Sequence, residues 1–160
     1  ENVRLAIATG VAGLSIEDRH GIDLYPIALA TERIRASREA IDRSGENVLL
    51  VGRSEGLLLG NTTIDTTVER LIAYAAAGAD CVYAPGIRSL ADIRALVTAV
   101  APTPVNVLLI DPAMNVPELA AAGVRRVSVG GGFAKAAWAA YERVARSVIE
   151  DGHWPRSKAS

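Results

Sequence analysis

The sequence predicts an α/β fold in which helices alternate with the strands of one parallel sheet. The main observation is a pattern found in three places: ATGVAGLSI (8–16), AAGADCVYA (76–84) and AAGVRRVSV (121–129). In each copy an alanine-rich helical segment stops at a glycine suited to a helix C-cap, and an apolar strand begins shortly after it. Strands that are nearly all apolar and alternate with helices are typical of a parallel sheet buried on both faces.

Two further strands fit between these copies. Their segments are NVLLVGRS (47–54) and TPVNVLLI (103–110), the second opened by Pro102 and Pro104, which suit the start of a strand but not its interior. Apolar residues at helical spacing predict the intervening helices, with Thr31 as a cap for the first of them. The predicted helices cover residues 29–43, 63–77, 90–100, 117–122 and 133–150.

Two architectures fit this alternation: an open doubly wound sheet, or part of a (β/α)₈ barrel, which normally needs about 250 residues. An open sheet usually binds a nucleotide at a glycine-rich turn after its first strand, but here that turn reads EDRHGIDL (17–24). Polar residues instead lie at the C-terminal ends of several strands, as they do in barrel active sites. They are Ser15, Glu17, Arg53, Glu55, Tyr83, Asn106 and Ser128. We therefore predict a partial barrel of about five βα units over residues 1–152, followed by a tail over 153–160.

Composition limits the classes of function. The chain has 160 residues, of which 50% are hydrophobic, and a net charge of −1, which gives no reason to expect nucleic acid or an anionic membrane as a partner. No apolar run approaches the roughly 20 residues of a membrane span, and no signal-peptide pattern opens the chain, so we expect a cytoplasmic protein. Cys81 cannot form an internal disulfide, and its apolar neighbours favour a buried, inert thiol.

Six segments, taken in order and spacing, resemble the isocitrate lyase/phosphoenolpyruvate mutase superfamily. They are AGLSIEDR (12–19), ERIRASREAID (32–42), VGRSEGLLLG (51–60), TTVERLIAYAAAGADCVYAPG (66–86), PVNVL (104–108) and ELAAAGVRRVSVGGGFAKAAWAA (118–140). The likeness is strongest to the phosphoenolpyruvate mutase-like branch. It implies a Mg²⁺-dependent (β/α)₈ enzyme that makes or breaks a C–C or P–C bond next to a carboxylate through an enolate-like intermediate. It also implies that this chain supplies barrel strands 4 to 8, and that the acidic segment providing most of the magnesium ligands lies upstream.

The resemblance assigns roles to two charged residues at strand ends. Glu17 matches an acidic residue that reaches the metal mainly through bound water, and one carboxylate makes only a partial magnesium site. Arg53 matches an arginine that binds a substrate carboxylate, for which a planar guanidinium offers two parallel hydrogen bonds. The alternative is that both side chains are only structural, with Glu17 paired to Arg19 or Arg53, and Arg53 paired to Glu17 or Glu55.

We also assign predicted roles to other residues in or after these strands. Ser15, on the same side of its strand as Glu17, and Asn106 are predicted to contact the substrate. Asp18 points the other way and is predicted to be a structural hydrogen-bonding residue. His20 lies in the loop that would cover the site, where it is either a general acid or base or a solvent-exposed side chain. The glycines at 130–132 open the last helix and fit either an anion site or a tight turn.

Departures from the family pattern limit which of the family's reactions we expect. The loop after Glu17 lacks the cysteine that acts as acid or base in the true lyases of the family, and Pro85 stands where they carry a glutamate. Cleavage of isocitrate or methylisocitrate is therefore not expected. We predict a Mg²⁺-dependent lyase or hydrolase that cleaves a C–C bond in a small 2-oxo or 2-hydroxy carboxylate. The alternatives are a phosphonopyruvate P–C mutase or hydrolase, and a non-catalytic barrel fragment that acts as an assembly module.

The last predicted helix carries an unusual share of the aromatic residues. Phe133, Trp138 and Tyr141 lie close together there, and Trp138 diverges by about 100° from Ala137 around the helix. A wide apolar face with aromatic residues favours a protein interface. The resemblance also implies exchange of this helix between subunits, so we predict a homo-oligomer with Trp138 buried between subunits.

Overall fold

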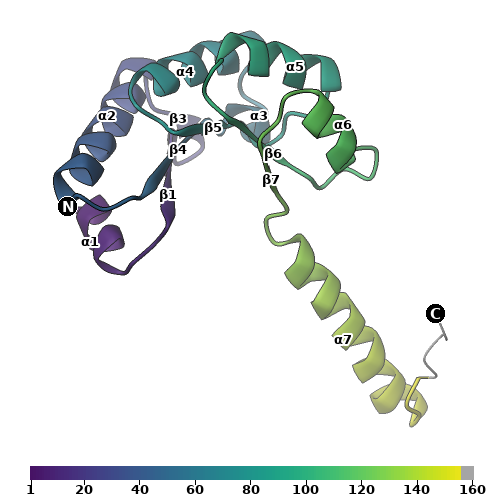
Figure 1. Ribbon diagram of the computed structural model, residues 1–160. Coiled ribbons are helices and arrows are strands. Elements are labelled where there is room, and N and C mark those ends of the chain that lie inside the picture. Colours follow the sequence, from purple (N-terminus) through teal and green to yellow (C-terminus); the bar gives the residue numbers. More distant parts are fainter. Residues whose placement is uncertain (156–160) are drawn as a thin grey trace. The chain divides into compact units, whose positions relative to one another are not determined.

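The computed structural model describes residues 1–155, which form two compact units, 1–128 and from residue 129 onward. The first unit contains a parallel sheet whose strands are β1 (Gly13–Glu17), β4 (Leu49–Arg53), β5 (Cys81–Tyr83), β6 (Val105–Leu108) and β7 (Arg126–Ser128). Neighbouring strands in this sheet follow one another in the order β1-β4-β5-β6-β7, all parallel (Figure 1). The predicted α/β class with a parallel sheet is confirmed. The order never reverses, as it would in a doubly wound sheet, and it matches successive strands of a barrel.

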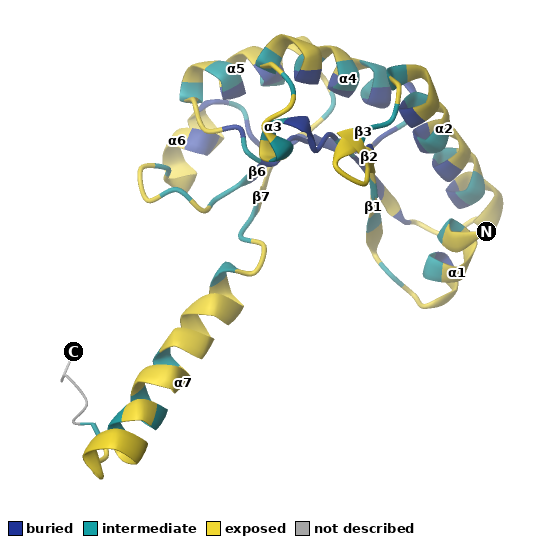
Figure 2. Cartoon of the chain, turned by 180° about the vertical axis from the view of Figure 1, so that it is seen from behind, coloured by how far each residue is buried: buried dark blue, intermediate teal, exposed yellow. Residues whose placement is uncertain are grey.

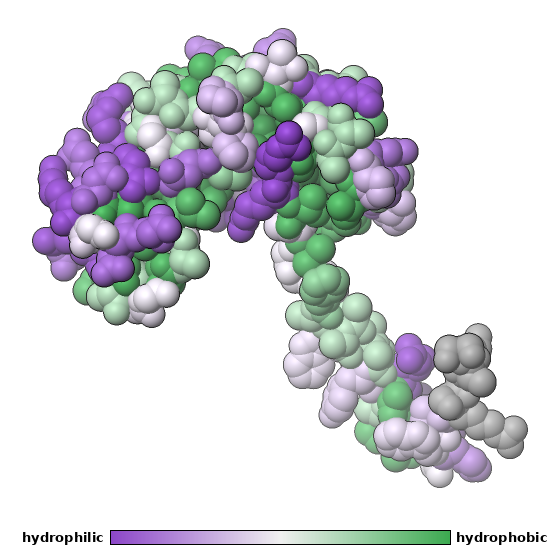
Figure 3. Space-filling model, in the orientation of Figure 1, coloured by the Kyte–Doolittle hydropathy of each residue, from purple (hydrophilic) through white to green (hydrophobic). Residues whose placement is uncertain are grey.

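Helices cover one face of this sheet. The first unit contains α1 (Asn2–Ala8), α2 (Ile27–Ser44), α3 (Gly56–Leu59), α4 (Ile64–Ala76), α5 (Leu90–Ala99) and α6 (Val116–Ala121). The main core lies between the helices and the strands, and its largest fully buried side chains include Ile34 of α2, Leu71 of α4 and Leu96 of α5. Figure 2 shows the buried residues concentrated where α2, α4 and α5 face the strands. Charged side chains of α2 face outward, and Figure 3 shows hydrophilic residues gathered over that part of the molecule.

Three helix starts are fixed by side chains that accept hydrogen bonds from the first turn. Thr63 accepts from the Thr66 N–H at 3.2 Å, Ser89 caps α5 and Asn115 caps α6 in the same way. The predicted cap at Thr31 is wrong. Helix α2 begins at Ile27 after Pro26, and the Thr31 hydroxyl donates back to the carbonyl of Ile27 at 2.8 Å within the helix.

Two short features were not predicted. Strands β2 (Arg19–His20) and β3 (Asp23–Leu24) form an antiparallel hairpin directly after β1, and α3 forms directly after β4. Elements of two to four residues are too short to show a hydrophobic period, so sequence patterns identify only a loop there. Both features lie at the C-terminal ends of the strands, which is where the candidate site lies.

Gly52 of β4 lets helix α4 approach the sheet closely. A Cβ at this position would lie 2.9 Å from the Cβ of Tyr74 and 3.2 Å from that of Ala79. Any larger residue would therefore push α4 away from the strand. The close approach brings the Tyr74 side chain to the end of β1, where it takes part in the network described below.

The face of the sheet opposite the helices carries a second, smaller apolar cluster. It consists of Val51, Cys81 and Tyr83, with Leu108 packed against them. Register pairs Val51 with Cys81 and Arg53 with Tyr83, so alternate residues of neighbouring strands share this face. In a barrel this is the inward face.

The second unit contains α7 (Gly132–Asp151), whose C-cap is Gly152. Trp138 and Tyr141 contact each other edge to face, with ring centroids 5.6 Å apart, and Figure 3 shows hydrophobic residues along the start of this helix. The division into a domain over 1–152 and a tail over 153–160 stays a prediction, and residues 156–160 of that tail lie outside the described residues. Over residues 1–155, none of the helices is both long and apolar enough to cross a membrane.

Candidate active site at the strand ends

The predicted polar residues form one row across the sheet. Register pairs Glu17 with Arg53, Arg53 with Tyr83, and Tyr83 with Asn106. Side chains paired in this way across parallel strands point to the same face, which here is the face opposite the helices. Glu17, Arg53 and Tyr83 are the last residues of their strands. The structure thus brings the two principal predicted site residues together at the carboxyl end of the sheet.

Arg53 lies at the centre of this row. Its Nη1 is 3.3 Å from Glu17 Oε1, its Nε donates to Glu55 Oε1, and its guanidinium lies over the Tyr83 ring, 5.1 Å from the centroid. Burial alone would lower the pKa of Arg53, but the Glu55 hydrogen bond and the charges of Glu55 and Glu17 outweigh it, so the pKa is raised. The guanidinium therefore keeps its charge throughout the range in which an enzyme works. The Arg53–Glu17 and Arg53–Glu55 ion pairs of the structural alternative are present, whereas the described residues show no ion pair between Glu17 and Arg19.

Asp18 turns to the opposite side of β1 from Glu17, as predicted. Its carboxylate is buried, with Oδ1 accepting from the Glu55 backbone N–H at 2.9 Å. Oδ2 accepts from the Tyr74 hydroxyl at 2.7 Å and from Arg70 Nη1 at 3.2 Å. Burial, followed by the hydrogen bond to the Asp18 carboxylate, raises the pKa of Tyr74. Asp18 therefore ties the end of β1 to helix α4 and to the segment after β4.

Sequence reasoning missed Arg70 and Tyr74. They are four residues apart on α4 and so share one face of the helix. A buried tyrosine hydroxyl usually finds a hydrogen-bond partner, which was an available signal that Tyr74 has a polar neighbour. The identity of that neighbour depends on the close contact at Gly52, which cannot be read from local sequence patterns.

Glu17 is the carboxylate available to a metal in this row. Its side chain is 45% exposed, whereas Glu55 is 2% exposed and is bound to Arg53. No cluster of three or more histidine, cysteine, aspartate or glutamate side chains suited to a metal occurs within residues 1–155. A magnesium ion that keeps several waters and takes one or two carboxylates fits Glu17 as one ligand of a partial site.

Asn106 and Ser15 occupy different positions on the same face. Asn106 is fully buried, its Nδ2 donates to the Ser128 hydroxyl at 3.0 Å, and its Oδ1 has no hydrogen-bond partner among the described residues. A buried acceptor without a donor is costly and suggests a group supplied from outside the described chain. Ser15 is exposed and pairs with Val51, two positions before Glu17. Among the described side chains, no hydrogen bond joins the Ser15 hydroxyl to Glu17 or Arg53.

Two other candidate side chains, Cys81 and His20, differ in burial. Cys81 is buried in the small apolar cluster, and burial raises the pKa of its thiol, which agrees with the predicted inert role. His20 is exposed on the β2–β3 hairpin, with its ring 5.0 Å from that of Tyr25. The hairpin follows Glu17 directly, so His20 lies near the candidate site in sequence, but no contact to Glu17 or Arg53 is described.

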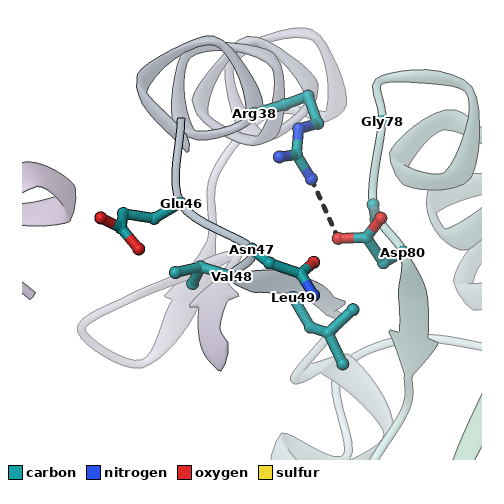
Figure 4. A pocket seen from close by; sticks show the side chains of 8 residues that line it. Arg38, Glu46, Asn47, Val48, Leu49, Gly78 and Asp80 are labelled. Atoms are coloured by element: carbon teal, nitrogen blue, oxygen red, sulfur yellow. Dashed lines mark hydrogen bonds and ion pairs between the residues drawn. The ribbon is translucent and has the colours of Figure 1, made fainter. Parts of the chain in front are cut away.

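A cavity of about 480 Å³ lies at the other end of the sheet. Figure 4 shows Arg38 and Asp80 pointing toward one another across it, with Nη1 and Oδ2 3.0 Å apart. Asp80 also accepts from the Leu50 backbone N–H at 2.7 Å. These contacts join α2 to the start of β4 and β5, and in barrels this end generally serves stability rather than catalysis.

Comparison with known proteins places this arrangement in a family. Residues 1–149 match the model of the phosphoenolpyruvate phosphomutase family. An oxaloacetate decarboxylase of Rhodopseudomonas palustris is 30% identical over 169 residues, covering 98% of this chain and 57% of that protein. A solved structure assigned to the lyases or mutases, from Burkholderia cenocepacia J2315, superposes with a TM-score of 0.91 at 40% identity, covering 99% of this chain and 58% of that one.

A second solved structure is oxaloacetate acetylhydrolase in complex with its product oxalate. It superposes with a TM-score of 0.85 at 26% identity, covering 96% of this chain and 55% of that one. The chain thus belongs to the phosphoenolpyruvate phosphomutase family, within the phosphoenolpyruvate mutase/isocitrate lyase superfamily, and the predicted resemblance is confirmed. The chain spans about half the length of the curated relatives that it matches.

Proposed function

We propose that the protein is a Mg²⁺-dependent lyase or hydrolase that cleaves a C–C bond in a small 2-oxo or 2-hydroxy carboxylate. The observation that carries this proposal is the pairing of Arg53 with the exposed Glu17 at the carboxyl end of the sheet. The names of the relatives support the reaction class, since one is an oxaloacetate decarboxylase and another an oxaloacetate acetylhydrolase.

Each residue has a stated task in this proposal. Arg53 binds the substrate carboxylate, and its positive charge stabilises the negative charge that develops on an enolate. Glu17 contributes one ligand to Mg²⁺, mainly through bound water, and Asn106 Oδ1 accepts from a donor on the substrate or its water. A bound Mg²⁺ would supply Lewis-acid polarisation of the 2-oxo group. The ring face of Tyr83 packs against the guanidinium of Arg53 and helps to position it.

The experiment follows product formation from oxaloacetate in the presence of MgCl₂. Pyruvate would identify a decarboxylase, whereas oxalate with acetate would identify a hydrolase. We expect Arg53→Lys to lower kcat/KM at least about tenfold, because a lysine keeps the charge but loses the forked geometry. Arg94→Lys, on an exposed position of α5, is the matched control and should leave kcat/KM unchanged. Equal kinetics for the Arg53 variant and the wild type would remove Arg53 from the substrate site.

Phosphonate chemistry is the second candidate. The family model that matches residues 1–149 is that of phosphoenolpyruvate phosphomutase, whose name gives this reading its support. Turnover of phosphonopyruvate without turnover of oxaloacetate would favour it over C–C cleavage.

A further inference from the structure

We propose that Glu55 is a positioning residue that fixes the orientation of Arg53, so that a substrate carboxylate is received only on the Nη1–Nη2 edge of the guanidinium. The proposal rests on the proposed function, in which Arg53 binds a carboxylate. It goes further by assigning a role to Glu55 and by stating which side of Arg53 is open.

The two carboxylates around Arg53 differ in position and in burial. Glu55 is bonded to Nε and its side chain is 2% exposed, whereas Glu17 lies 3.3 Å from Nη1 and its side chain is 45% exposed. A buried charge that loses its partner is far more costly than an exposed one. Glu55 is therefore the permanent partner of Arg53, and Glu17 is the partner that can exchange.

The Glu55 backbone is itself held in place. Its N–H donates to Asp18 Oδ1 at 2.9 Å, and Asp18 is fixed from α4 by the Tyr74 hydroxyl. The next residue, Gly56, has no room for a side chain, because a Cβ there would lie 2.0 Å from Thr62 Cγ2. On the other side, the carbonyl of Glu55 accepts from the Leu59 N–H at 3.0 Å and that of Gly56 accepts from the Asn61 N–H at 3.2 Å. The carboxylate of Glu55 therefore reaches Arg53 from a backbone that is hydrogen-bonded on both sides.

This arrangement decides how a substrate is received. A guanidinium can bind a carboxylate through two parallel N–H groups on either of two edges, one of which includes Nε. Because Glu55 occupies Nε, only the Nη1–Nη2 edge is open, and Glu17 stands at its Nη1 end. An incoming carboxylate therefore displaces Glu17 from Arg53, and leaves Glu55 where it is.

The test compares two neutral variants of similar size, Glu55→Gln and Glu55→Met. Both remove the charge, but only glutamine keeps an oxygen that can accept from Arg53 Nε. Oxalate is the probe, titrated calorimetrically into each protein in the presence of MgCl₂. We expect Glu55→Met to bind oxalate at least about fivefold more weakly than Glu55→Gln, as the loss of one hydrogen bond implies.

The other outcomes are distinguishable. Equal oxalate affinities for the two variants would mean that Glu55 acts through its charge alone, and would overturn the proposal. A wild-type protein that does not bind oxalate would instead overturn the proposed carboxylate site, and this inference with it. Glu46→Gln, on an exposed residue at the other end of the sheet, is the control and should bind as the wild type does.

A second measurement covers the case in which Glu55→Met does not fold. The Arg53 Nε–H resonance of the wild-type protein is followed by NMR during the oxalate titration. We expect this signal to shift little and to exchange slowly with water, because Nε stays on the buried Glu55, whereas the Nη signals should change. A large shift or loss of the Nε–H signal on oxalate binding would overturn the proposal.

Discussion

Glu17, the last residue of β1, and Asp18, which follows it, have opposite surroundings because successive side chains along an extended chain point to opposite sides. Alternation along β1 sends Glu17 to the open face of the sheet, where it is exposed, and Asp18 toward α4, where it is buried. Glu17 thereby stays available to a metal or to Arg53, and Asp18 accepts three hydrogen bonds within the protein. The exposed Glu17 is the carboxylate to which we assign a role in catalysis, and the buried Asp18 fixes the geometry around it.

The Tyr74 hydroxyl should contribute measurably to stability. We expect Tyr74→Phe to lower the free energy of unfolding by about 1–3 kcal/mol, because it removes one donor from the buried Asp18 carboxylate and leaves the others in place. Urea unfolding measures this difference. Tyr141→Phe, on an exposed residue of α7, is the matched control. An unchanged urea midpoint for Tyr74→Phe would show that the hydrogen bonds from Arg70 and the Glu55 N–H are sufficient for the buried Asp18 carboxylate.

The packing of helix α4 on strand β4 helps to position the residues of the candidate site. Gly52 permits the close approach, and the same approach delivers Tyr74 to the end of β1. Stability and site geometry therefore depend on the same contact between a helix and a strand.

Gly52→Ala tests this contact. We expect it to destabilise the protein by about 1–3 kcal/mol, because the added methyl would overlap the Cβ atoms of Tyr74 and Ala79 and force α4 outward. Thermal unfolding gives the size of the effect. Gly131→Ala adds the same methyl where no atom lies within 4 Å and should be nearly neutral. Equal melting temperatures for the two variants would show that the close packing at Gly52 does not contribute to stability.

Sequence patterns predicted the long elements well and the short ones poorly. Alternating apolar strands and helices follow from hydrophobic periods, which local sequence records, and so the parallel sheet and the pairing of Glu17 with Arg53 on one face could be expected. The β2–β3 hairpin and α3 are too short to show a hydrophobic period, and the helix for which Thr31 was the predicted cap begins earlier, at Ile27. The side-chain partners of Asp18 could not be predicted, because Arg70 and Tyr74 come from α4, more than 50 residues away in the chain.

At the scale of the whole molecule, helix α7 presents more apolar surface than its own unit covers. Phe133 is 77% exposed, and Trp138 and Tyr141 are each 64% exposed. Among the described residues of α7, none is fully buried. Exposed aromatic residues grouped on one helix are typical of an interface with another protein chain.

We therefore propose a homo-oligomer that buries Trp138 between subunits. Sedimentation at tens of micromolar, a concentration at which ordinary interfaces are occupied, should give a dimer or larger species. Trp138→Ala should shift the population toward the monomer, whereas Trp154→Ala, which removes another exposed tryptophan, should not. A wild-type monomer at that concentration would contradict the proposal.

The sequential strand order also bears on how the chain folds. Every strand in the five-stranded sheet pairs only with the strands before and after it in that sheet, so each pairing closes one loop that contains at least one helix. The loops shorten toward the C-terminal end, from the one that joins Gly13 to Leu49 to the one that joins Asn106 to Arg126. Loop-closure entropy grows with length, although only by about 0.6 kcal/mol for each doubling. The pairing of β1 with β4, which brings Glu17 to Arg53, therefore closes the longest loop in the sheet. That loop is less than twice as long as the shortest one, so its extra closure entropy is below about 0.6 kcal/mol, and the strand pair that carries the charged residues forms at little more cost than the others.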